Sequence, residues 1–172
     1  SRSLTAHDLV ARFRATASPA AFTLATRLAA APLNARVVRA VARTVVRSGP
    51  EHLTEVLTSD LVRPVPHGAA TGDTRIRYEF VHGVRERLLT LGYRDRTVEV
   101  QHVVEYELAH DVEAVRNLTL RVKDPRNASY ERVTPAAEPY LRVELAVHLS
   151  LGGPNLVAAA RLGQALGSPI PR

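Results

Sequence analysis

RYEFVHGVRERLL, at residues 77–89, changes its periodicity in the middle. Its first part belongs to residues 74–80, where polar and apolar side chains alternate as they do in a half-buried strand. From residue 81 to residue 91 the apolar side chains, such as Val84 and Leu88, recur at helical spacing instead. The sequence therefore predicts a strand that is followed directly by a helix.

The residues before this strand predict its partner and three helices. Residues 61–65 are short and β-like, and residues 67–73 have the composition of a loop, so a hairpin with a long tip is expected. Each of three preceding segments shows helical spacing and is delimited by Ser, Asn, Gly or Pro. These helices are predicted at residues 20–31, 35–48 and 50–61. Three helices followed by a two-stranded wing form the winged-helix pattern, here over about residues 18–92.

Further helices are predicted on both sides of this core. They lie at residues 5–16, 94–110 and 135 to about 150, with a helix or turn at residues 112–122. We therefore expect a mainly α fold, in which residues 1–154 form one compact helical domain and residues 94–152 are its C-terminal helical layer. The Ala-rich residues 155–172 are predicted to be a loosely held tail, for which a last helix is one option.

Composition and charge exclude several classes of protein. The chain of 172 residues has no cysteine, which excludes disulfides and thiolate metal sites. No apolar run approaches the roughly 20 residues that a bilayer requires, and no signal-peptide pattern is present, so a cytoplasmic location is expected. The net charge is +6, and residues 1–50 alone carry eight arginines and one acid. This asymmetry predicts one basic face.

Four arginines of the helix predicted at residues 35–48 fall within one arc of roughly 80°. They are Arg36, Arg39, Arg43 and Arg47. Because arginine pairs bidentately with carboxylates, this row is predicted to bind an acidic partner surface. The alternative is a solvated helix face, whose repulsion is relieved by acids of the same chain such as Glu138 or Glu144.

Nucleic-acid binding is the second hypothesis. Winged helices dock their third helix into the major groove, and Arg75 and Arg77 of the predicted wing are the candidate nucleic-acid contacts. The predicted third helix, however, has no Arg or Lys between residues 50 and 62. Its acidic side chains are Glu51, Glu55 and Asp60. An acidic recognition helix is poorly matched to a polyanion.

No pattern for catalysis, metal binding or cofactor binding is present. His102, Glu105 and His110 lack the HExxH spacing of metallohydrolase helices. There is no GxSxG elbow, and residues 68–73 (GAATGD) lack the GK[ST] of a phosphate-binding loop. We therefore expect a protein that is not an enzyme and that holds neither a metal nor a cofactor.

Four motifs resemble a family of Actinobacteria. They are RFRATASP at residues 12–19, LAAAPL at 28–33, GPEHLTEVL at 49–57 and YEFVHGVRERLL at 78–89. Over about residues 9–154 the chain is similar to the effector-associated winged-helix-like region of multidomain proteins. In that family the region accompanies caspase-like or trypsin-like peptidase modules, kinases and STAND-type nucleotide-binding modules, in defence or signalling.

The resemblance implies a regulatory or adaptor module without enzymatic activity. Such a module mediates protein–protein or interdomain contacts in a multidomain effector or a STAND-type protein. The expected partners are other domains of the same polypeptide or a partner effector protein, with no membrane involved. A DNA-binding domain of a transcriptional regulator is the alternative.

Overall fold

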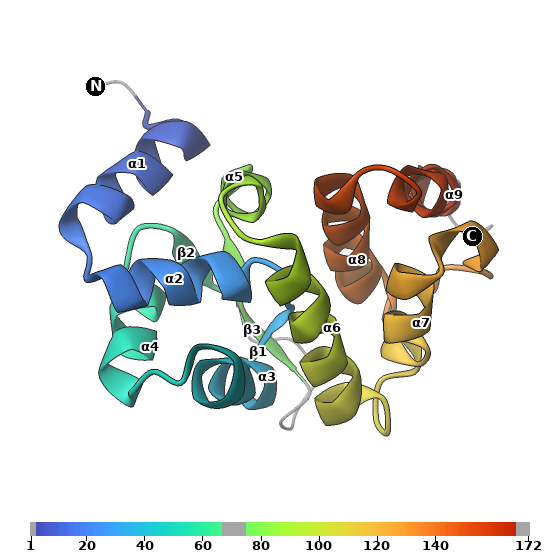
Figure 1. Cartoon of the computed structure of the whole chain (residues 1–172), viewed down its shortest axis with the longest axis horizontal. Helices are drawn as coiled ribbons and strands as arrows, with labels where there is room; N and C mark the ends of the chain where they lie inside the picture. Colours follow the sequence, from blue (N-terminus) through green and yellow to red (C-terminus); the bar gives the residue numbers. More distant parts are fainter. Residues whose placement is uncertain (1–2, 67–74, 168–172) are drawn as a thin grey trace.

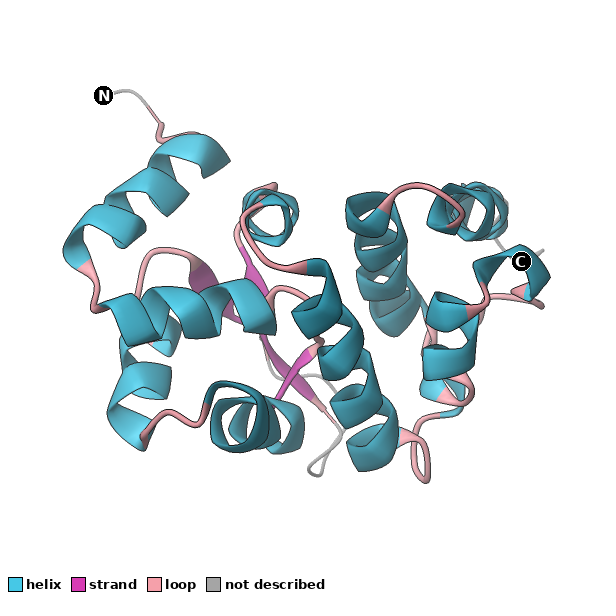
Figure 2. Ribbon diagram, viewed as in Figure 1, coloured by secondary structure: helices cyan, strands magenta, loops and turns pink. Residues whose placement is uncertain are grey.

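The fold is mainly helical, with one small antiparallel sheet (Figure 1, Figure 2). The computed structural model describes residues 3–66 and 75–167, so the loop predicted at residues 67–73 lies outside the described residues. In chain order the elements are α1 (Ala6–Thr16), α2 (Pro19–Leu28), β1 (Leu33–Asn34), α3 (Ala35–Ala40), the π-helical η1 (Val41–Val46), α4 (Pro50–Leu57), β2 (Val62–Pro64), β3 (Ile76–Phe80), α5 (Val84–Thr90), α6 (Arg94–Leu108), the 3₁₀ turn η2 (Glu113–Val115), α7 (Leu118–Lys123), the 3₁₀ turn η3 (Pro125–Asn127), α8 (Glu138–Leu151) and α9 (Asn155–Gly167). The expectation of a mainly α fold is confirmed.

Polar side chains start the first three helices. Thr5 and Asp8 form a capping box at α1, and the Ser18 hydroxyl accepts a hydrogen bond from the backbone N–H of Ala21 at the start of α2. At α3 the side-chain oxygen Oδ1 of Asn34 accepts hydrogen bonds from the backbone N–H groups of Arg36 and Val37. These contacts satisfy N–H groups that a helix leaves without partners, which is why the helices begin close to the predicted residues.

The sheet has the strand order β1-β3-β2, and both pairings are antiparallel. The predicted hairpin is β2 and β3, with Val62 opposite Phe80. The sequence did not predict β1, because this strand has only two residues and Asn34 carries the signal of a helix cap. After β3, Gly83 adopts a φ of 84° and so turns the chain directly into α5.

Left-handed residues end one predicted helix early and divide another predicted segment. Arg47 adopts a left-handed conformation with a φ of 56° and ends η1 at Val46, and the Ser48 N–H donates to the Ala42 carbonyl across this end. Asn117, with a φ of 63°, separates η2 from α7 where one helix or turn was predicted. Apolar spacing alone contains no signal for such single left-handed residues.

One apolar cluster runs through the molecule from α1 to α8. Its fully buried members include Leu24, Leu28, Val37, Val41, Leu88 and Val100. In Figure 1, α6 lies between the N-terminal elements and the group α7–α9, and it contacts α2 and α3 on one side and α7 on the other. Among the described residues, no helix has the length and apolarity to cross a bilayer.

The segment after residue 154 contains the last helix. Residues 155–167 of the predicted loosely held tail form α9, which packs against α8. Ala158 and Leu162 are fully buried there, since small alanine side chains let two helices approach closely. These buried side chains are not members of the main apolar cluster. Residues 168–172 lie outside the described part of the chain.

Candidate interaction surface and buried polar network

The predicted arginine row divides into two parts. Arg39, Arg43 and Arg47 are exposed on α3–η1, and we call these three residues the basic surface. Within residues 3–66 and 75–167 their side chains make no ion pair or hydrogen bond. No carboxylate of the described residues therefore pairs with these three exposed charges.

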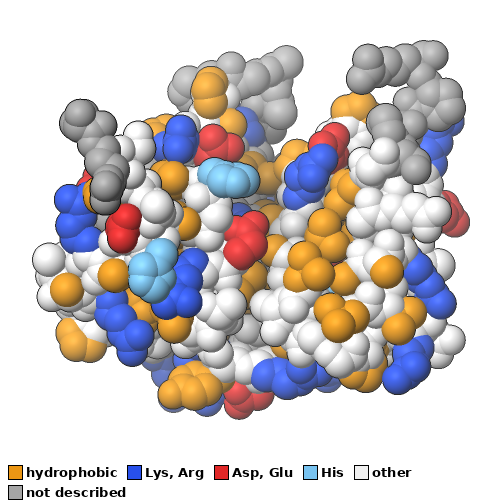
Figure 3. Space-filling view, turned by 90° about the horizontal axis from the view of Figure 1, so that it is seen from above, with side chains coloured by type: hydrophobic (Ala, Val, Ile, Leu, Met, Phe, Trp, Pro, Cys, Tyr) orange, Lys and Arg blue, Asp and Glu red, His pale blue; other side chains and the backbone are white. Residues whose placement is uncertain are grey.

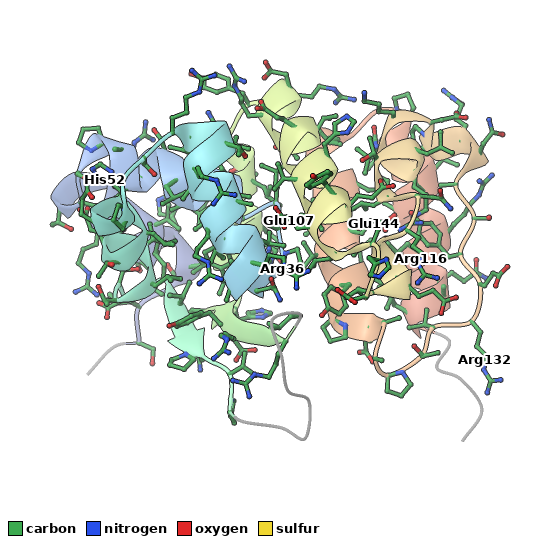
Figure 4. The ribbon with its side chains drawn as sticks, turned by 90° about the horizontal axis from the view of Figure 1, so that it is seen from below. Arg36, His52, Glu107, Arg116, Arg132 and Glu144 are labelled. Carbon is green, nitrogen blue, oxygen red and sulfur yellow. The ribbon has the colours of Figure 1, made fainter. Side chains whose placement is uncertain are left out.

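Arg36 is half-buried and is engaged within the chain. Its Nη1 donates to the Glu107 carbonyl at 2.9 Å and lies 3.4 Å from the Asp111 carboxylate. Figure 4 shows Arg36 and Glu107 beside each other, where α3 meets α6. Among the described acids, Asp111 pairs with Arg36, whereas Glu138 pairs with Arg142 and Glu144 with Arg121. Arg36 fixes α3 against the C-terminal end of α6.

The π-helical turns change the geometry of the row. The predicted arc assumed about 100° per residue throughout the helix, as an α-helix has. In η1 each hydrogen bond spans five residues, so a turn holds more residues and Arg43 and Arg47 are shifted in phase relative to Arg36. Nothing in the spacing of the arginines predicts this change.

The other described arginines of the N-terminal segment have partners. Arg12 lies 3.7 Å from the Asp60 carboxylate, and the Arg14 guanidinium lies 5.0 Å from the centre of the Phe22 ring. Arg27 stacks at 5.6 Å on Tyr93, and burial together with the charge of Arg96 lowers the pKa of Arg27. The basic excess of this segment is thus left uncompensated at the basic surface.

The acids of α4 have different roles. Glu55 accepts hydrogen bonds from the Ser18 N–H at 2.7 Å and from the Ser18 hydroxyl at 3.1 Å, and so it holds the start of α2. Glu51 and Asp60 are exposed. Glu51 is therefore exposed on α4, and Asp60 is exposed three residues after its end, where it faces Arg12, while Glu55 stabilises the start of α2.

The two arginines of the predicted wing lie at the sheet. Arg77 is exposed on β3, and Arg75 is half-buried just before this strand, where its carbonyl accepts from the Asn34 side chain at 3.3 Å. The basic surface lies on α3–η1 instead. The basic surface and the pair Arg75 and Arg77 thus lie on different elements. Each set of arginines can therefore be substituted while the other is left intact.

A group of polar side chains that the sequence did not single out lies between α7, α8 and α9. We call Arg121, Tyr130, Glu144, His148 and Asn155 the buried network. Glu144 is 3% exposed and His148 0%. The Glu144 carboxylate accepts from Arg121 Nη2 at 2.8 Å and Nε at 3.0 Å, from His148 Nε2 at 3.0 Å and from the Tyr130 hydroxyl.

The electrostatics of the network keep Glu144 ionised. Burial acts to raise the pKa of Glu144, but the hydrogen bonds from His148, Arg121 and Tyr130 and the Arg121 charge outweigh it, so the pKa is lowered. The pKa of Tyr130 is raised by burial and by the adjacent carboxylate. The pKa of Arg121 is raised, because the bond to Glu144 outweighs burial. The network therefore contains one buried ion pair.

The cavity that Glu144 lines is small. The cavity beside Glu144 measures about 10 Å³ and is lined by Gln101, Tyr140 and neighbouring apolar side chains. That volume holds about one water molecule. What the arrangement can do is fix the relative positions of α7, α8 and α9, since all five side chains are committed to one another or to the backbone.

The histidines and acids considered for a metal site are dispersed. Glu105 accepts from the Thr119 N–H at 2.8 Å, while His102 and His110 are exposed. Within the described ranges, no group of three or more His, Asp or Glu side chains could hold a metal ion. The carboxylate of Glu105 instead holds the start of α7.

A larger cleft, of about 500 Å³, opens between β3, the start of α5 and the N-terminal end of α8. Its walls combine Tyr78 and Phe80 with Pro135 and Pro139. Arg85 lies at this cleft, donates to the carbonyls of residues 29 and 31 at 2.8 and 2.7 Å, and has a pKa that burial lowers to about 10. Its guanidinium therefore caps free carbonyl groups just after the C-terminal end of α2.

Apolar side chains also gather on the outside of α8 and α9. Figure 3 shows them on the right half of the molecule, where these two helices lie. Leu149 of α8 and Leu156 of α9 are 54% and 49% exposed.

No protein-family model matches this chain, and neither the curated proteins nor the solved structures include a significant match to it. A functional conclusion must therefore depend on the basic surface, the acidic residues of α4 and the buried network.

Proposed function

We propose that this chain is a regulatory or adaptor module, without enzymatic activity, that contacts another domain or a partner protein in the cytoplasm through the basic surface. One observation carries the proposal. Three arginines are exposed without an intrachain partner among the described residues: Arg39 on α3, Arg43 on η1 and Arg47 directly after η1. The other described arginines of the N-terminal segment are engaged. Arginine is favoured in interfaces, where its planar group pairs with carboxylates.

The order of elements supports a winged-helix-like core. From α2 to β3 the chain runs helix, strand, helix, helix, strand, strand, and the last two strands form the hairpin that serves as the wing. Together with the motifs at residues 12–19 and 78–89, this order favours the effector-associated region of actinobacterial proteins. In that family the module stands beside peptidase or STAND-type modules of defence or signalling proteins, so a neighbouring domain is the partner we propose.

The charges of α4 favour a protein partner over DNA. A winged helix that reads DNA places this helix against the phosphates, and here Glu51 and Asp60 are exposed on or next to it. A protein partner meets no such repulsion, because its acidic groups need to face only the basic surface. Like charges on one helix repel each other by a few tenths of a kcal/mol per pair, which an acidic partner relieves.

Fluorescence anisotropy with two labelled probes tests the proposal. One probe is a glutamate-rich helical peptide, and the other is a random DNA duplex, each titrated from about 50 to 200 mM salt. The test variant changes Arg39, Arg43 and Arg47 to Glu. The matched control changes three exposed arginines elsewhere, Arg63, Arg77 and Arg132, to Glu.

We expect the peptide to bind the wild type and the control, and to bind the test variant about tenfold or more weakly, as loss of charged pairs implies. Binding of DNA with a steep salt dependence that both variants abolish would contradict the proposal, since the control removes the wing arginine Arg77. That outcome would establish the DNA-binding alternative. Absence of peptide binding to the wild type would also count against an acidic partner.

A further inference from the structure

The attachment of α9 combines buried apolar side chains with polar contacts at its first residue. Its buried side chains Ala158 and Leu162 lie outside the main apolar cluster. At its first residue, Asn155 is 2% exposed and connects three parts of the chain. The Asn155 amide nitrogen donates to the Val122 carbonyl at 3.0 Å, and its oxygen accepts from Arg94 Nη2 at 3.4 Å. These two bonds fix which way the amide group points.

This orientation determines the protonation state of His148. The Asn155 amide nitrogen is also 3.1 Å from His148 Nδ1. Because an amide NH₂ group can only donate, Nδ1 must be the accepting, unprotonated nitrogen. The proton then lies on Nε2, which is 3.0 Å from Glu144 and 2.9 Å from the Tyr130 oxygen. The contacts of both ring nitrogens are thus those of a neutral imidazole.

A second proton on His148 has no acceptor among the described residues. It would go to Nδ1 and would face the donor group of Asn155. Turning the amide would supply an oxygen, but it would break the bond to Val122 and bring the NH₂ group against the Arg94 guanidinium. Two donors that face each other in a buried site lose the bond and pay the desolvation of both groups.

The charged groups around His148 do not remove this conflict. Glu144 on α8 faces Nε2, but it is already paired with Arg121 of α7 and accepts from Tyr130 in the segment before α8. From α6, Arg94 approaches behind Asn155. The described neighbours on α6, α7, α8 and α9 therefore offer two cations and one compensated carboxylate to an imidazolium.

We infer that His148 is an acid-sensitive latch for α9. While the imidazole is neutral, Asn155 bridges it to Val122 and Arg94 and α9 stays docked on α8. When the imidazole gains a proton at Nδ1, the bridge breaks and α9 detaches, which uncovers Ala158, Ala159 and Leu162. This device is independent of the basic surface, so it stands whether or not the proposed function is right.

Hydrogen exchange of the wild-type chain at two pH values tests the latch. The values are about 7.5 and 5.5, which bracket the range in which histidine side chains change charge. After correction for the intrinsic pH dependence of exchange, we expect protection of α9 to fall about tenfold or more at the lower pH, as loss of a buried hydrogen bond implies. Protection of α2, which lies in the main apolar cluster, should not change.

Two variants separate His148 from other groups. In His148→Gln the amide nitrogen keeps a donor toward Glu144 and cannot titrate, so the loss of α9 protection at low pH should disappear. In the matched control His102→Gln, an exposed histidine of α6 is removed, and the pH dependence should remain. If His148→Gln keeps the full loss, another group is responsible and the latch is wrong.

A measurement on the wild type covers the case in which His148→Gln does not fold. The ¹⁵N chemical shifts of the two ring nitrogens at about pH 7.5 report which one holds the proton, and we expect the Nε2–H form. A neutral Nδ1–H form would overturn the inference. So would α9 protection that is the same at both pH values.

Discussion

The N-terminal elements and the C-terminal helices of this chain are held together by different kinds of interaction. In α1–α5 and the sheet, most buried side chains are apolar, as at Leu24, Leu28 and Leu88, and the buried amide of Asn34 is an exception. In α7–α9, a carboxylate, an imidazole and an amide are buried beside the apolar groups. Apolar contacts are not directional and tolerate small shifts, whereas hydrogen bonds between buried charged groups require one geometry. The comparison indicates that the stability of the N-terminal part depends mainly on filling the apolar core. The stability of the C-terminal part depends in addition on the distances and orientations of its buried hydrogen bonds.

Helix α6 connects the two parts and shows both kinds of contact. Val100, Val104 and Leu108 belong to the apolar cluster, while Gln101 donates to the Ala30 carbonyl at 2.8 Å. At its first residue, Arg94 donates to the Leu151 carbonyl at the end of α8. A displacement of α8 would therefore break the hydrogen bond between Arg94 and the Leu151 carbonyl.

The largest effect is expected from Glu144→Gln. This change removes the charge opposite Arg121 and leaves buried donors of Arg121, His148 and Tyr130 with poorer partners. Breaking a buried pair in this way costs about 3–5 kcal/mol. Urea unfolding measures the loss. The control Glu138→Gln removes the exposed pair with Arg142, and its cost should stay below about 1 kcal/mol. If both variants lost the same free energy of unfolding, the buried network would contribute no more to stability than an exposed ion pair does.

The apolar part is tested by Leu28→Ala in α2. Because Leu28 is fully buried in the main cluster, we expect a loss of about 2–5 kcal/mol in the free energy of unfolding. Leu162→Ala in α9 makes the same truncation outside that cluster, and its cost should lie at the lower end of that range, at about 2 kcal/mol. Urea unfolding of both variants makes the comparison, and a larger loss for Leu162→Ala would contradict it.

Acid should weaken the C-terminal part through Glu144. The pKa of this carboxyl is lower in the folded than in the unfolded chain. Its stabilisation is therefore complete above the unfolded pKa of about 4.3 and is lost as the pH falls through the folded value. Thermal unfolding between about pH 6 and pH 2 should show this loss in the wild type and a smaller one in Glu144→Gln. Parallel curves would mean that other carboxyls account for acid unfolding.

A smaller effect is expected from Ser18→Ala. The hydroxyl caps α2 and also donates to Glu55, so its removal leaves the Ala21 N–H without a partner. Loss of such a cap costs about 1 kcal/mol. Ser150→Ala, at an exposed serine near the end of α8, provides the control, and its change should be near zero. A loss in the control as large as in Ser18→Ala would show that the cap adds nothing.

Caps and apolar periodicity made much of the fold predictable. Ser18 and Asn34 are standard helix starts, and the change of period at residues 77–89 corresponds to β3 followed by α5. The strand β1 was not predicted, because two residues are too few to show the alternation of a strand. The π-helical turns and the left-handed Arg47 escaped because they depend on tertiary packing, which local propensity does not record.

The candidate site was predictable only in part. The arginines were visible as a row, but the engagement of Arg36 depends on Glu107 and Asp111, which are more than 70 residues away in the chain. The buried network escaped for the same reason. Glu144 and His148 are four residues apart on one helix, and that spacing is equally typical of an exposed pair. Only the arrival of Arg121, Tyr130 and Asn155 from other elements distinguishes them.

The edge of the sheet limits how this chain can associate with others. The Val65 N–H donates to the Arg77 carbonyl and the Leu61 carbonyl accepts from the Val81 N–H, so alternate residues of β2 face β3. Pro64 therefore turns its backbone outward, and it has no N–H group. A strand from another molecule laid along this edge would find no donor at that position. Sheet extension, and the aggregation that follows from it, are therefore disfavoured along the β2 edge.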